Sequence, residues 1–189
     1  MKSWKTLERR IVFQHSKYLT VESHTVELAD GRIISDWPWI ITPDFINVIA
    51  VTTEGKWLCF RQTKYAVEGT SLAPVGGYIE PGEDPLETAK RELREEMGYE
   101  ASQWIHLGSY RMGANRGIAT GHFYLARDAH YVTKPQSDDL EEQELLLLDS
   151  SEVEEALVKG EFKVLGWVAN VALALLYLHR SSEPSWDQK

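Results

Sequence analysis

Apolar and polar residues alternate in several short stretches of this chain, one later stretch carries apolar residues at helical spacing, and a long apolar stretch lies near the C-terminus. Alternation predicts half-buried strands, and short apolar runs between turns predict buried ones. We therefore expect strands over residues 18–28, 32–36, 47–52, 56–62, 104–111, 121–125 and 145–148. We expect helices over residues 85–97, 152–159 and 163–180.

Turn residues separate these elements. Asp30-Gly31 is a typical hairpin turn and predicts that the first two strands pair with each other. Glu54-Gly55 separates the third and fourth strands in the same way. The sequence shows no internal repeat and no long linker.

The helix expected over residues 85–97 has clear ends. Asp84 is a suitable N-cap, Pro85 suits the first helical position, and Gly98 is a natural helix stop. One narrow apolar sector of this helix contains Leu86, Ala89, Leu93 and Met97. This sector predicts the face that packs on the core.

Three glutamates of this helix, Glu92, Glu95 and Glu96, fall together in the adjoining sector. Like-charged pairs on one helix destabilise it by roughly 0.2–0.5 kcal/mol each. A hard divalent cation would relieve that repulsion, because Mg²⁺ prefers oxygen ligands and binds through a few carboxylates together with substrate phosphates. Taken alone, such a helix is more often a solvated face with salt bridges, so the surrounding sequence decides between the two interpretations.

The surrounding residues complete a known motif. Residues 77–99 have the sequence G-Y-I-E-P-G-E-D-P-L-E-T-A-K-R-E-L-R-E-E-M-G-Y. This segment resembles the Nudix box, Gly-x5-Glu-x7-Arg-Glu-U-x-Glu-Glu-x-Gly-U, in which U is a bulky apolar residue; Tyr99 stands where an aliphatic residue is usual. The resemblance implies a Nudix hydrolase, a metal-dependent enzyme that splits diphosphates linked to another group.

The resemblance also implies which residues bind the metal. Glu92 and Glu96 are implied as the principal ligands, with Glu95 assisting. The carbonyl of Gly76 is implied to complete the metal shell. The expected cofactor is Mg²⁺, with Mn²⁺ as an alternative.

The implied fold is α+β, a mixed β-sheet sandwiched between helices and preceded by an N-terminal β-hairpin extension. We expect the extension at residues 1–45, the hydrolase domain at 46–180 and a flexible tail at 181–189. Within this fold, Glu83 and Arg91 are implied to form a buried ion pair that braces the loop against the helix.

Three outer segments resemble those of the ADP-ribose and nucleoside diphosphate sugar pyrophosphatases. The N-terminal hairpin, which ends in Gly31-Arg32, resembles the dimerising extension of that group. Residues 60–65 resemble its Arg-Gln-x-Arg-Tyr segment, which makes Arg61 a candidate substrate contact. Residues 142–145 resemble its Glu-x-Glu-x-Ile segment.

The last of these segments contains the candidate general base. Glu142 is the first candidate for the group that acts on the attacking water, and Glu144 is the second. A carboxylate beside cations keeps its ionised form, which suits it to accept or orient a proton from water. The alternative is a solvated acidic loop over residues 138–144.

Two segments depart from that group and leave the substrate within the class open. Residues 109–116 (S-Y-R-M-G-A-N-R) lack the proline that the group carries after the box. Residues 73–77 (A-P-V-G-G) lack its glutamate before the box. Candidate contacts to a phosphate or ribose are Arg111, Asn115 and Arg116, although arginines at loop ends are commonly surface residues.

Trp37-Pro38-Trp39 has two interpretations. The tryptophans either pack in the core or in a dimer interface, or one ring stacks on a nucleobase, as aromatic residues of the related extension do across the dimer. Trp37 is the candidate for stacking because it directly follows a predicted strand.

Composition sets the remaining limits. The formal net charge of −9 argues against general nucleic-acid binding, which relies on positive surface. The single cysteine, Cys59, excludes an internal disulfide and lies in an apolar run typical of a buried thiol. The first residues lack the apolar segment of a signal peptide, and the apolar stretch 164–178 is shorter than the about 20 residues of a membrane span. We therefore expect a cytoplasmic protein with no nucleic-acid and no membrane partner.

Together these patterns predict a homodimeric, Mg²⁺-dependent pyrophosphatase. It would convert ADP-ribose or a related nucleoside diphosphate sugar into a nucleoside monophosphate and a sugar phosphate. Two alternatives stay open. One is a Nudix hydrolase of nucleoside triphosphates or dinucleoside polyphosphates, and the other is a Nudix sensor that binds nucleotide sugars without cutting them.

Overall fold

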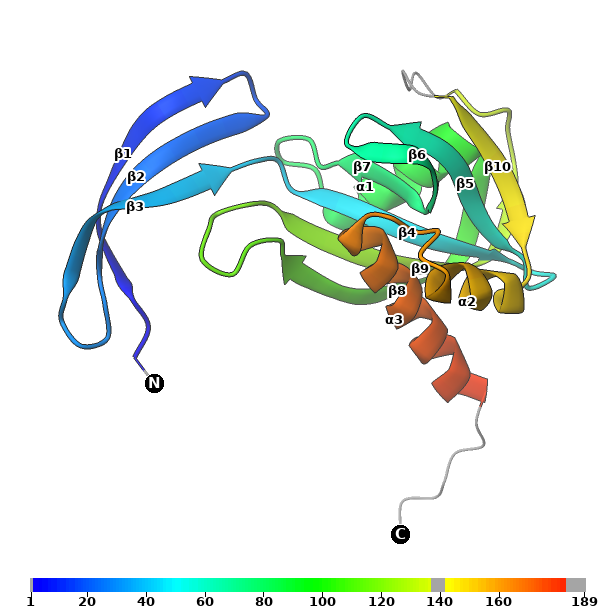
Figure 1. Ribbon diagram of the computed structural model, residues 1–189. Coiled ribbons are helices and arrows are strands. Elements are labelled where there is room, and N and C mark those ends of the chain that lie inside the picture. The colour runs from blue at the N-terminus through cyan, green and yellow to red at the C-terminus, as the bar shows by residue number, and fades with distance from the viewer. Residues whose placement is uncertain (1, 137–141, 183–189) are drawn as a thin grey trace, which may run out of the picture. The chain divides into compact units, whose positions relative to one another are not determined.

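A computed structural model describes residues 2–136 and 142–182 of the chain. Its elements divide into two compact units. Residues 1–45 and 110–121 form the first, and residues 46–109 and 122–189 form the second. Figure 1 labels the helices and strands of both units.

The first unit contains a three-stranded antiparallel sheet in the order β1-β2-β3 (Figure 1). Its strands are β1 Lys5–His15, β2 Leu19–Glu27 and β3 Ile33–Ile41. The expected turn is present, because Gly31 has φ +87° and the Arg32 amide donates to Asp30 Oδ1 at 3.1 Å. This sheet confirms the predicted N-terminal hairpin.

Two features of this sheet differ from the prediction. The hydrophobic pattern does not predict β1, because its side chains are exposed throughout and its pairing with β2 has two shifts of register. β3 runs on past Asp36 to Ile41 although it contains Pro38. The proline is tolerated because β3 is an edge strand of the sheet.

The second unit contains a seven-stranded sheet, in which five strands follow the order β10-β5-β4-β9-β8, β6 pairs with β5, and β7 pairs with β4. Its strands are β4 Phe45–Thr52, β5 Trp57–Lys64, β6 Val67–Ala73, β7 Val75–Tyr78, β8 Tyr99–Arg111, β9 Thr120–Tyr131 and β10 Gln143–Leu148. The helices are α1 Pro85–Glu92, continued by a π-helical turn over Leu93–Met97, α2 Ser150–Val158 and α3 Leu165–Ser182. These elements confirm the predicted α+β class.

β4 shows how the helices cover the sheet. It is buried on both faces, which explains its nearly continuous apolar sequence. On one face Ile46, Val48 and Ala50 pack with the apolar residues of α1 and the turn after it. On the other face Ile49 and Val51 pack with α2 and α3. The sheet therefore lies between α1 on one side and α2 and α3 on the other (Figure 1).

Most predicted elements of the second unit are present, with wider limits. β8 begins at Tyr99 and β9 runs to Tyr131. The pattern does not predict β6 and β7, which are short and contain glycines. Of the acidic loop expected over 138–144, residues 138–141 lie outside the described residues, and Gln143 begins β10. The expected tail lies outside the described residues from 183 onwards.

Two smaller expectations also have an outcome. Cys59 is buried, and burial raises the pKa of its thiol to about 12, so the thiol is inert, as expected. No helix within residues 2–136 and 142–182 is long and apolar enough to cross a membrane.

Candidate metal and substrate site

α1 is fixed at both ends. Asp84 Oδ1 accepts hydrogen bonds from the amides of Leu86 at 2.9 Å and Glu87 at 3.3 Å, so Asp84 is the predicted N-cap. At the other end Gly98 has φ +76°, and any Cβ there would overlap the carbonyl oxygen of Thr133. Only glycine fits this position, which explains why the helix ends there.

The last turn of this helix is wider than predicted. Leu93–Met97 forms a π-helical turn, whereas the spacing predicts a regular α-helix to residue 97. π-helical turns recur at functional sites. This one contains Glu95 and Glu96 and directly follows Glu92.

Arg91 joins the loop before α1 to the carboxylates of the helix. Its Nε donates to Glu83 Oε1 at 2.9 Å and its Nη2 to Glu83 Oε2 at 3.2 Å, which confirms the predicted ion pair. The pair is not buried as predicted, because both side chains are partly exposed. Its Nη1 donates to Glu92 Oε1 at 2.8 Å and to Glu95 Oε2 at 2.9 Å. One guanidinium therefore binds three carboxylates through charge-assisted hydrogen bonds.

The Glu83–Arg91 pair gives the fold a measurable pH dependence. Hydrogen bonding to Arg91 lowers the pKa of Glu83 from its usual 4.5 to about 2. Because the folded-state pKa is lowered, the contribution of the pair to the free energy of unfolding is complete above about pH 4.5 and is lost as the pH falls towards about 2. In urea unfolding between about pH 5 and pH 2.5, we expect the wild type to lose more stability than Glu83→Gln. Equal losses would contradict this role.

Glu92 is the more enclosed of the two box glutamates that bind Arg91. Its side chain is 13% exposed, whereas that of Glu95 is 50% exposed. It lies against Gly77, where any Cβ would overlap its carboxylate. Burial raises the pKa of Glu92, and the neighbouring Arg91 guanidinium opposes that shift. A buried carboxylate is costly without a positive charge beside it, and Arg91 supplies that charge to Glu92 at 2.8 Å.

The chemistry of the box residues fits a hard divalent cation. Glu92, Glu95 and Glu96 offer carboxylate oxygens, and Gly77 lets the loop backbone approach Glu92. Arg91 already places positive charge between Glu92 and Glu95. As the side chains stand, no group of three or more His, Cys, Asp or Glu residues in the described part of the chain is gathered to hold a metal ion. As they stand, Glu92 and Glu95 bind Arg91 instead.

Asn47 is a neighbour of the site that the sequence pattern does not reveal. A Cβ at Gly76 would come within 2.8 Å of Asn47 Oδ1, so a larger residue at position 76 would require Asn47 to shift. Asn47 is buried, and its Nδ2 has no hydrogen-bond partner among the described residues. The only signal in the sequence is a polar residue inside an otherwise apolar strand.

The predicted outer residues of the second unit lie on neighbouring strands. Glu144 on β10 stands opposite Arg61 on β5, and both Glu142 and Glu144 are exposed. Arg61 forms an ion pair with Glu161, with Nη2 2.9 Å from Oε2. Because such exposed pairs are weak, Arg61 remains able to exchange Glu161 for an anionic ligand.

The structure distinguishes the two tryptophans of the first unit. Trp39 stacks on His24 with ring centroids 5.0 Å apart, and it lies against Gly117, where any Cβ would overlap the indole. The Trp37 indole instead donates through Nε1 to the Asn115 carbonyl oxygen at 2.9 Å. The guanidinium of Arg116 lies over the Trp37 ring, 5.7 Å from its centroid.

Three of the four predicted substrate contacts of this unit are thus brought together, namely Trp37, Asn115 and Arg116. The fourth, Arg111, makes a different contact: its Nη1 donates to Thr120 Oγ1 at 3.0 Å. Asn115 contributes its main-chain carbonyl to this arrangement. No sequence pattern indicates that contact, since residues 37 and 115 are far apart in the chain.

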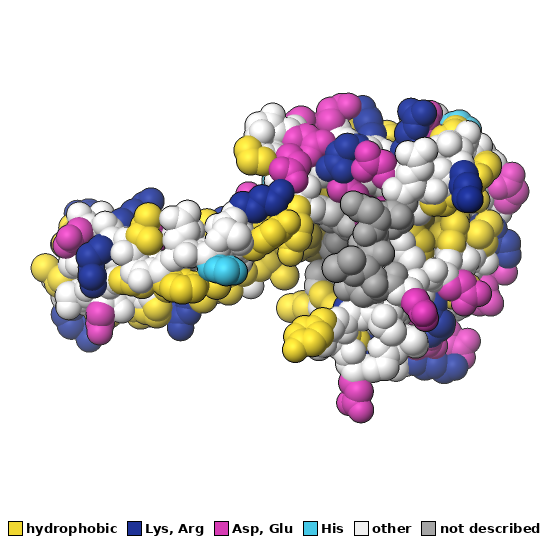
Figure 2. Space-filling view, turned by 90° about the horizontal axis from the view of Figure 1, so that it is seen from above, with side chains coloured by type: hydrophobic (Ala, Val, Ile, Leu, Met, Phe, Trp, Pro, Cys, Tyr) yellow, Lys and Arg dark blue, Asp and Glu magenta, His cyan; other side chains and the backbone are white. Residues whose placement is uncertain are grey.

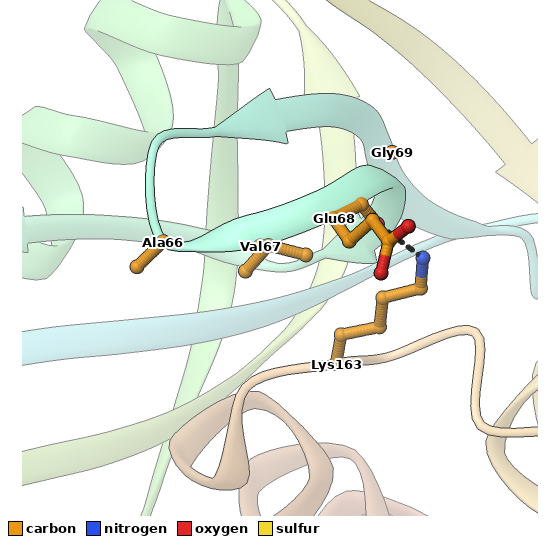
Figure 3. A pocket seen from close by; sticks show the side chains of 5 residues that line it. All are labelled: Ala66, Val67, Glu68, Gly69 and Lys163. Carbon is orange, nitrogen blue, oxygen red and sulfur yellow. Dashed lines mark hydrogen bonds between the residues drawn. The ribbon is translucent and has the colours of Figure 1, made fainter.

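The second unit also has pockets beyond the box carboxylates. One of about 520 Å³ lies at the β5–β6 hairpin, where Lys163 Nζ donates to the Glu68 carbonyl oxygen at 2.7 Å (Figure 3). Figure 3 shows its lining side chains: Ala66, Val67, Glu68, Gly69 and Lys163. Another of about 550 Å³ lies beside α1 and is lined by Glu87, Lys90, Arg91, Arg94, Glu100, Ala101, Ser102 and Trp104. Of Arg91 and the three glutamates that it binds, Arg91 alone lines one of these two pockets, the one beside α1.

Comparisons with known proteins agree with this arrangement. Residues 43–180 match the NUDIX domain, and residues 4–40 match the nucleoside diphosphate sugar hydrolase N-terminal domain. The ADP-ribose pyrophosphatase of Bacillus subtilis (strain 168) is 29% identical over 174 residues, which cover 92% of this chain and 91% of that protein. The methanol dehydrogenase activator of Bacillus methanolicus is 31% identical over 153 residues, covering 81% and 80% of the two chains.

The fold has a solved counterpart. The crystal structure of an ADP compounds hydrolase superposes with a TM-score of 0.80 at 20% identity, covering 96% of this chain and 97% of that one. At this identity the likeness shows the fold alone. The domain match, the intact box and the braced helix that carries the glutamates establish the family: the chain is a member of the Nudix hydrolase family.

Proposed function

We propose that this Nudix hydrolase cleaves the diphosphate bond of ADP-ribose or of a related nucleoside diphosphate sugar, with Mg²⁺ as cofactor. The observation that carries the proposal is the full-length likeness to an ADP-ribose pyrophosphatase, which extends beyond the box through the N-terminal region. The products would be a nucleoside monophosphate and a sugar phosphate.

Glu92, Glu95, Glu96 and the Gly76 carbonyl are the residues that would hold Mg²⁺. When bound, the metal would neutralise the diphosphate and lower the pKa of a bound water. Burial of Glu92 against Gly77 fixes one carboxylate, while the more exposed Glu95 has room to rotate. Arg91, anchored by Glu83, holds the start of this helix face in place.

Glu142, with Glu144 as the alternative, is the proposed general base. It would accept a proton from the attacking water as the water oxygen forms a bond to one phosphorus. The bond between that phosphorus and the bridging oxygen breaks, and the other phosphate leaves with its nucleoside or sugar. Both side chains are exposed, so they are accessible to water.

Trp37 and Arg116 are the proposed contacts for the nucleoside end of the substrate. The Trp37 indole is held by Asn115 and already carries a guanidinium over its ring. A base that stacks on Trp37 would lie next to that positive charge, which also suits a nearby phosphate. Arg61, Arg111 and the side chain of Asn115 are proposed as further substrate contacts.

We infer that residues 1–45 form the dimerising part of a homodimer. The N-terminal sheet exposes a series of large apolar side chains, as Figure 2 shows. They are Trp4, Leu7, Ile11, Val12, Phe13, Tyr18, Ile33 and Ile41. An apolar surface of this extent is typical of a protein interface, and a second copy of this chain is the proposed occupant.

The homodimer makes a direct prediction for light scattering. We expect the wild type to be a dimer at micromolar concentration and the double variant Ile11→Asp, Phe13→Asp to be a monomer, because burying two carboxylates in an apolar interface is unfavourable. Val158→Asp is the matched control, since Val158 is 88% exposed on α2, outside the proposed interface. A monomeric wild type would contradict the proposal.

A substrate panel tests the function. Purified protein is incubated with ADP-ribose, other nucleotide sugars, dinucleoside polyphosphates and nucleoside triphosphates, and kcat/KM is measured for each. The highest value is expected for ADP-ribose or a nucleotide sugar. Turnover confined to nucleoside triphosphates or dinucleoside polyphosphates would show that the proposed substrate class is wrong. Stoichiometric binding without product would favour a sensor.

A further inference from the structure

β8 and β9 bring two histidines and a serine together outside the box. Ser109 Oγ lies 3.0 Å from His106 Nε2 and 2.9 Å from His122 Nδ1. All three belong to the second unit, and both hydrogen bonds lie at its exposed surface. Two imidazole nitrogens from neighbouring strands therefore face one point that is open to solvent.

This convergence depends on an irregularity in β8. In a regular strand, residues 106 and 109 would point to opposite faces, because side chains alternate. Gly108 between them has φ +137°, a conformation that side chains rarely adopt. Such irregularities turn a neighbouring side chain to the other face and recur near functional sites. The glycine thus places His106 and Ser109 on the same side of the strand.

The His106 ring packs against a buried aromatic residue, Tyr124. Its centroid lies 5.2 Å from that of Tyr124, with a tilt of 36° between the rings. Tyr124 is 6% exposed and belongs to the core cluster that packs against α1. Trp104 contacts the same tyrosine edge-on, with centroids 6.4 Å apart. The orientation of the imidazole therefore depends on rigid core packing.

The donor atoms indicate what this site binds. A serine hydroxyl has one hydrogen, so it donates to one histidine nitrogen and accepts from the other. A metal ion instead accepts a lone pair from each neutral imidazole, and imidazole suits Zn²⁺, Cu²⁺ and Ni²⁺, whereas Mg²⁺ prefers oxygen. We propose that His106 and His122 form a second metal site, selective for a divalent transition-metal ion, with water and the Ser109 hydroxyl as the remaining ligands.

The test uses the full-length protein and Cu²⁺ or Zn²⁺ in the presence of excess Mg²⁺, which occupies oxygen sites. The electron paramagnetic resonance spectrum of the first bound Cu²⁺ is expected to show coupling to imidazole nitrogen. Calorimetric titration with Zn²⁺ is expected to give one site that weakens by at least about tenfold in His106→Ala and in His122→Ala, the scale on which even a hydrogen-bond partner of a metal ligand changes affinity. His130→Ala is the matched control, since His130 is exposed on the same strand as His122.

Two results would overturn the proposal. One is unchanged Zn²⁺ affinity in both histidine variants while their thermal unfolding matches the wild type. The other is loss of the site in Glu92→Gln with both histidines intact, which would assign the ion to the box. Neither readout depends on hydrolysis of a nucleotide sugar, so a failure here is distinguishable from a failure of the proposed function.

Discussion

Replacing Glu96 or Glu92 with glutamine is expected to lower kcat for diphosphate hydrolysis by two orders of magnitude or more at saturating Mg²⁺. An amide keeps the shape of the carboxylate but removes the charge that a divalent cation requires. A single electrostatic contact to a transition state is worth about 10²–10³ in rate. Both variants are expected to fold, because neither substitution removes volume from the core. Steady-state kinetics with circular dichroism of the same samples measures both effects.

Glu87→Gln is the matched control for this result. Glu87 lies on the same helix, and its ion pair with Lys90 at 2.7 Å is exposed on both sides. Loss of such a pair changes little in stability or rate. Wild-type turnover in both Glu92→Gln and Glu96→Gln would mean that the box carboxylates do not hold the catalytic metal.

Gly77→Ala is expected to reduce turnover about as strongly as Glu92→Gln while the fold is kept. A Cβ at position 77 would overlap the Glu92 carboxylate, which is the far end of a long side chain. The side chain is therefore forced out of its place, and the metal ligand is lost without any change at position 92. The measurement is kcat for Gly77→Ala together with its melting temperature.

The outcome separates an effect on the ligand from an effect on the backbone. Gly82→Ala is the control, because Gly82 lies in the turn between β7 and α1 and a Cβ there would meet nothing within 4 Å. Its φ of +85° predicts a stability loss of about 1 kcal/mol from the substitution but no loss of turnover. Full activity of Gly77→Ala would show that the position of Glu92 seen here is not needed for catalysis.

The parts of the molecule that the sequence predicts well rest on local signals. Asp84, Pro85 and Gly98 lie within or next to the helix that they delimit, and the bonds by which Asp84 and Gly98 cap it join residues that are close in sequence. The Glu83–Arg91 pair likewise spans eight residues. Such features leave a pattern in a single sequence, whereas the π-helical turn over residues 93–97 does not, because its apolar spacing is that of an ordinary helix.

The parts that the sequence does not predict depend on long-range contacts. Trp37 binds the carbonyl of a residue 78 positions away, and Arg61 pairs with Glu161, 100 positions away. The approach of His106 to His122 depends on one irregular glycine inside a strand. None of these contacts is indicated by periodicity, since each forms only when separate segments of the chain are brought together by the fold.

β1 fails to be predicted for a different reason. Strand prediction relies on one buried face, and every residue of β1 is exposed. In the proposed dimer, part of β1 is buried only when the second copy of the chain packs against it. A strand that is buried by a partner chain does not show the alternation by which a strand on the core of its own chain is recognised.

The most direct test of the central claim is product analysis after ADP-ribose is incubated with the protein, Mg²⁺ and, in parallel, excess chelator, with Glu92→Gln as the blank. AMP and ribose 5-phosphate in equal amounts are expected with Mg²⁺, and neither product is expected with chelator or with the variant. Intact ADP-ribose in all reactions, or equal conversion in the presence of chelator, would contradict the assignment of a Mg²⁺-dependent ADP-ribose pyrophosphatase.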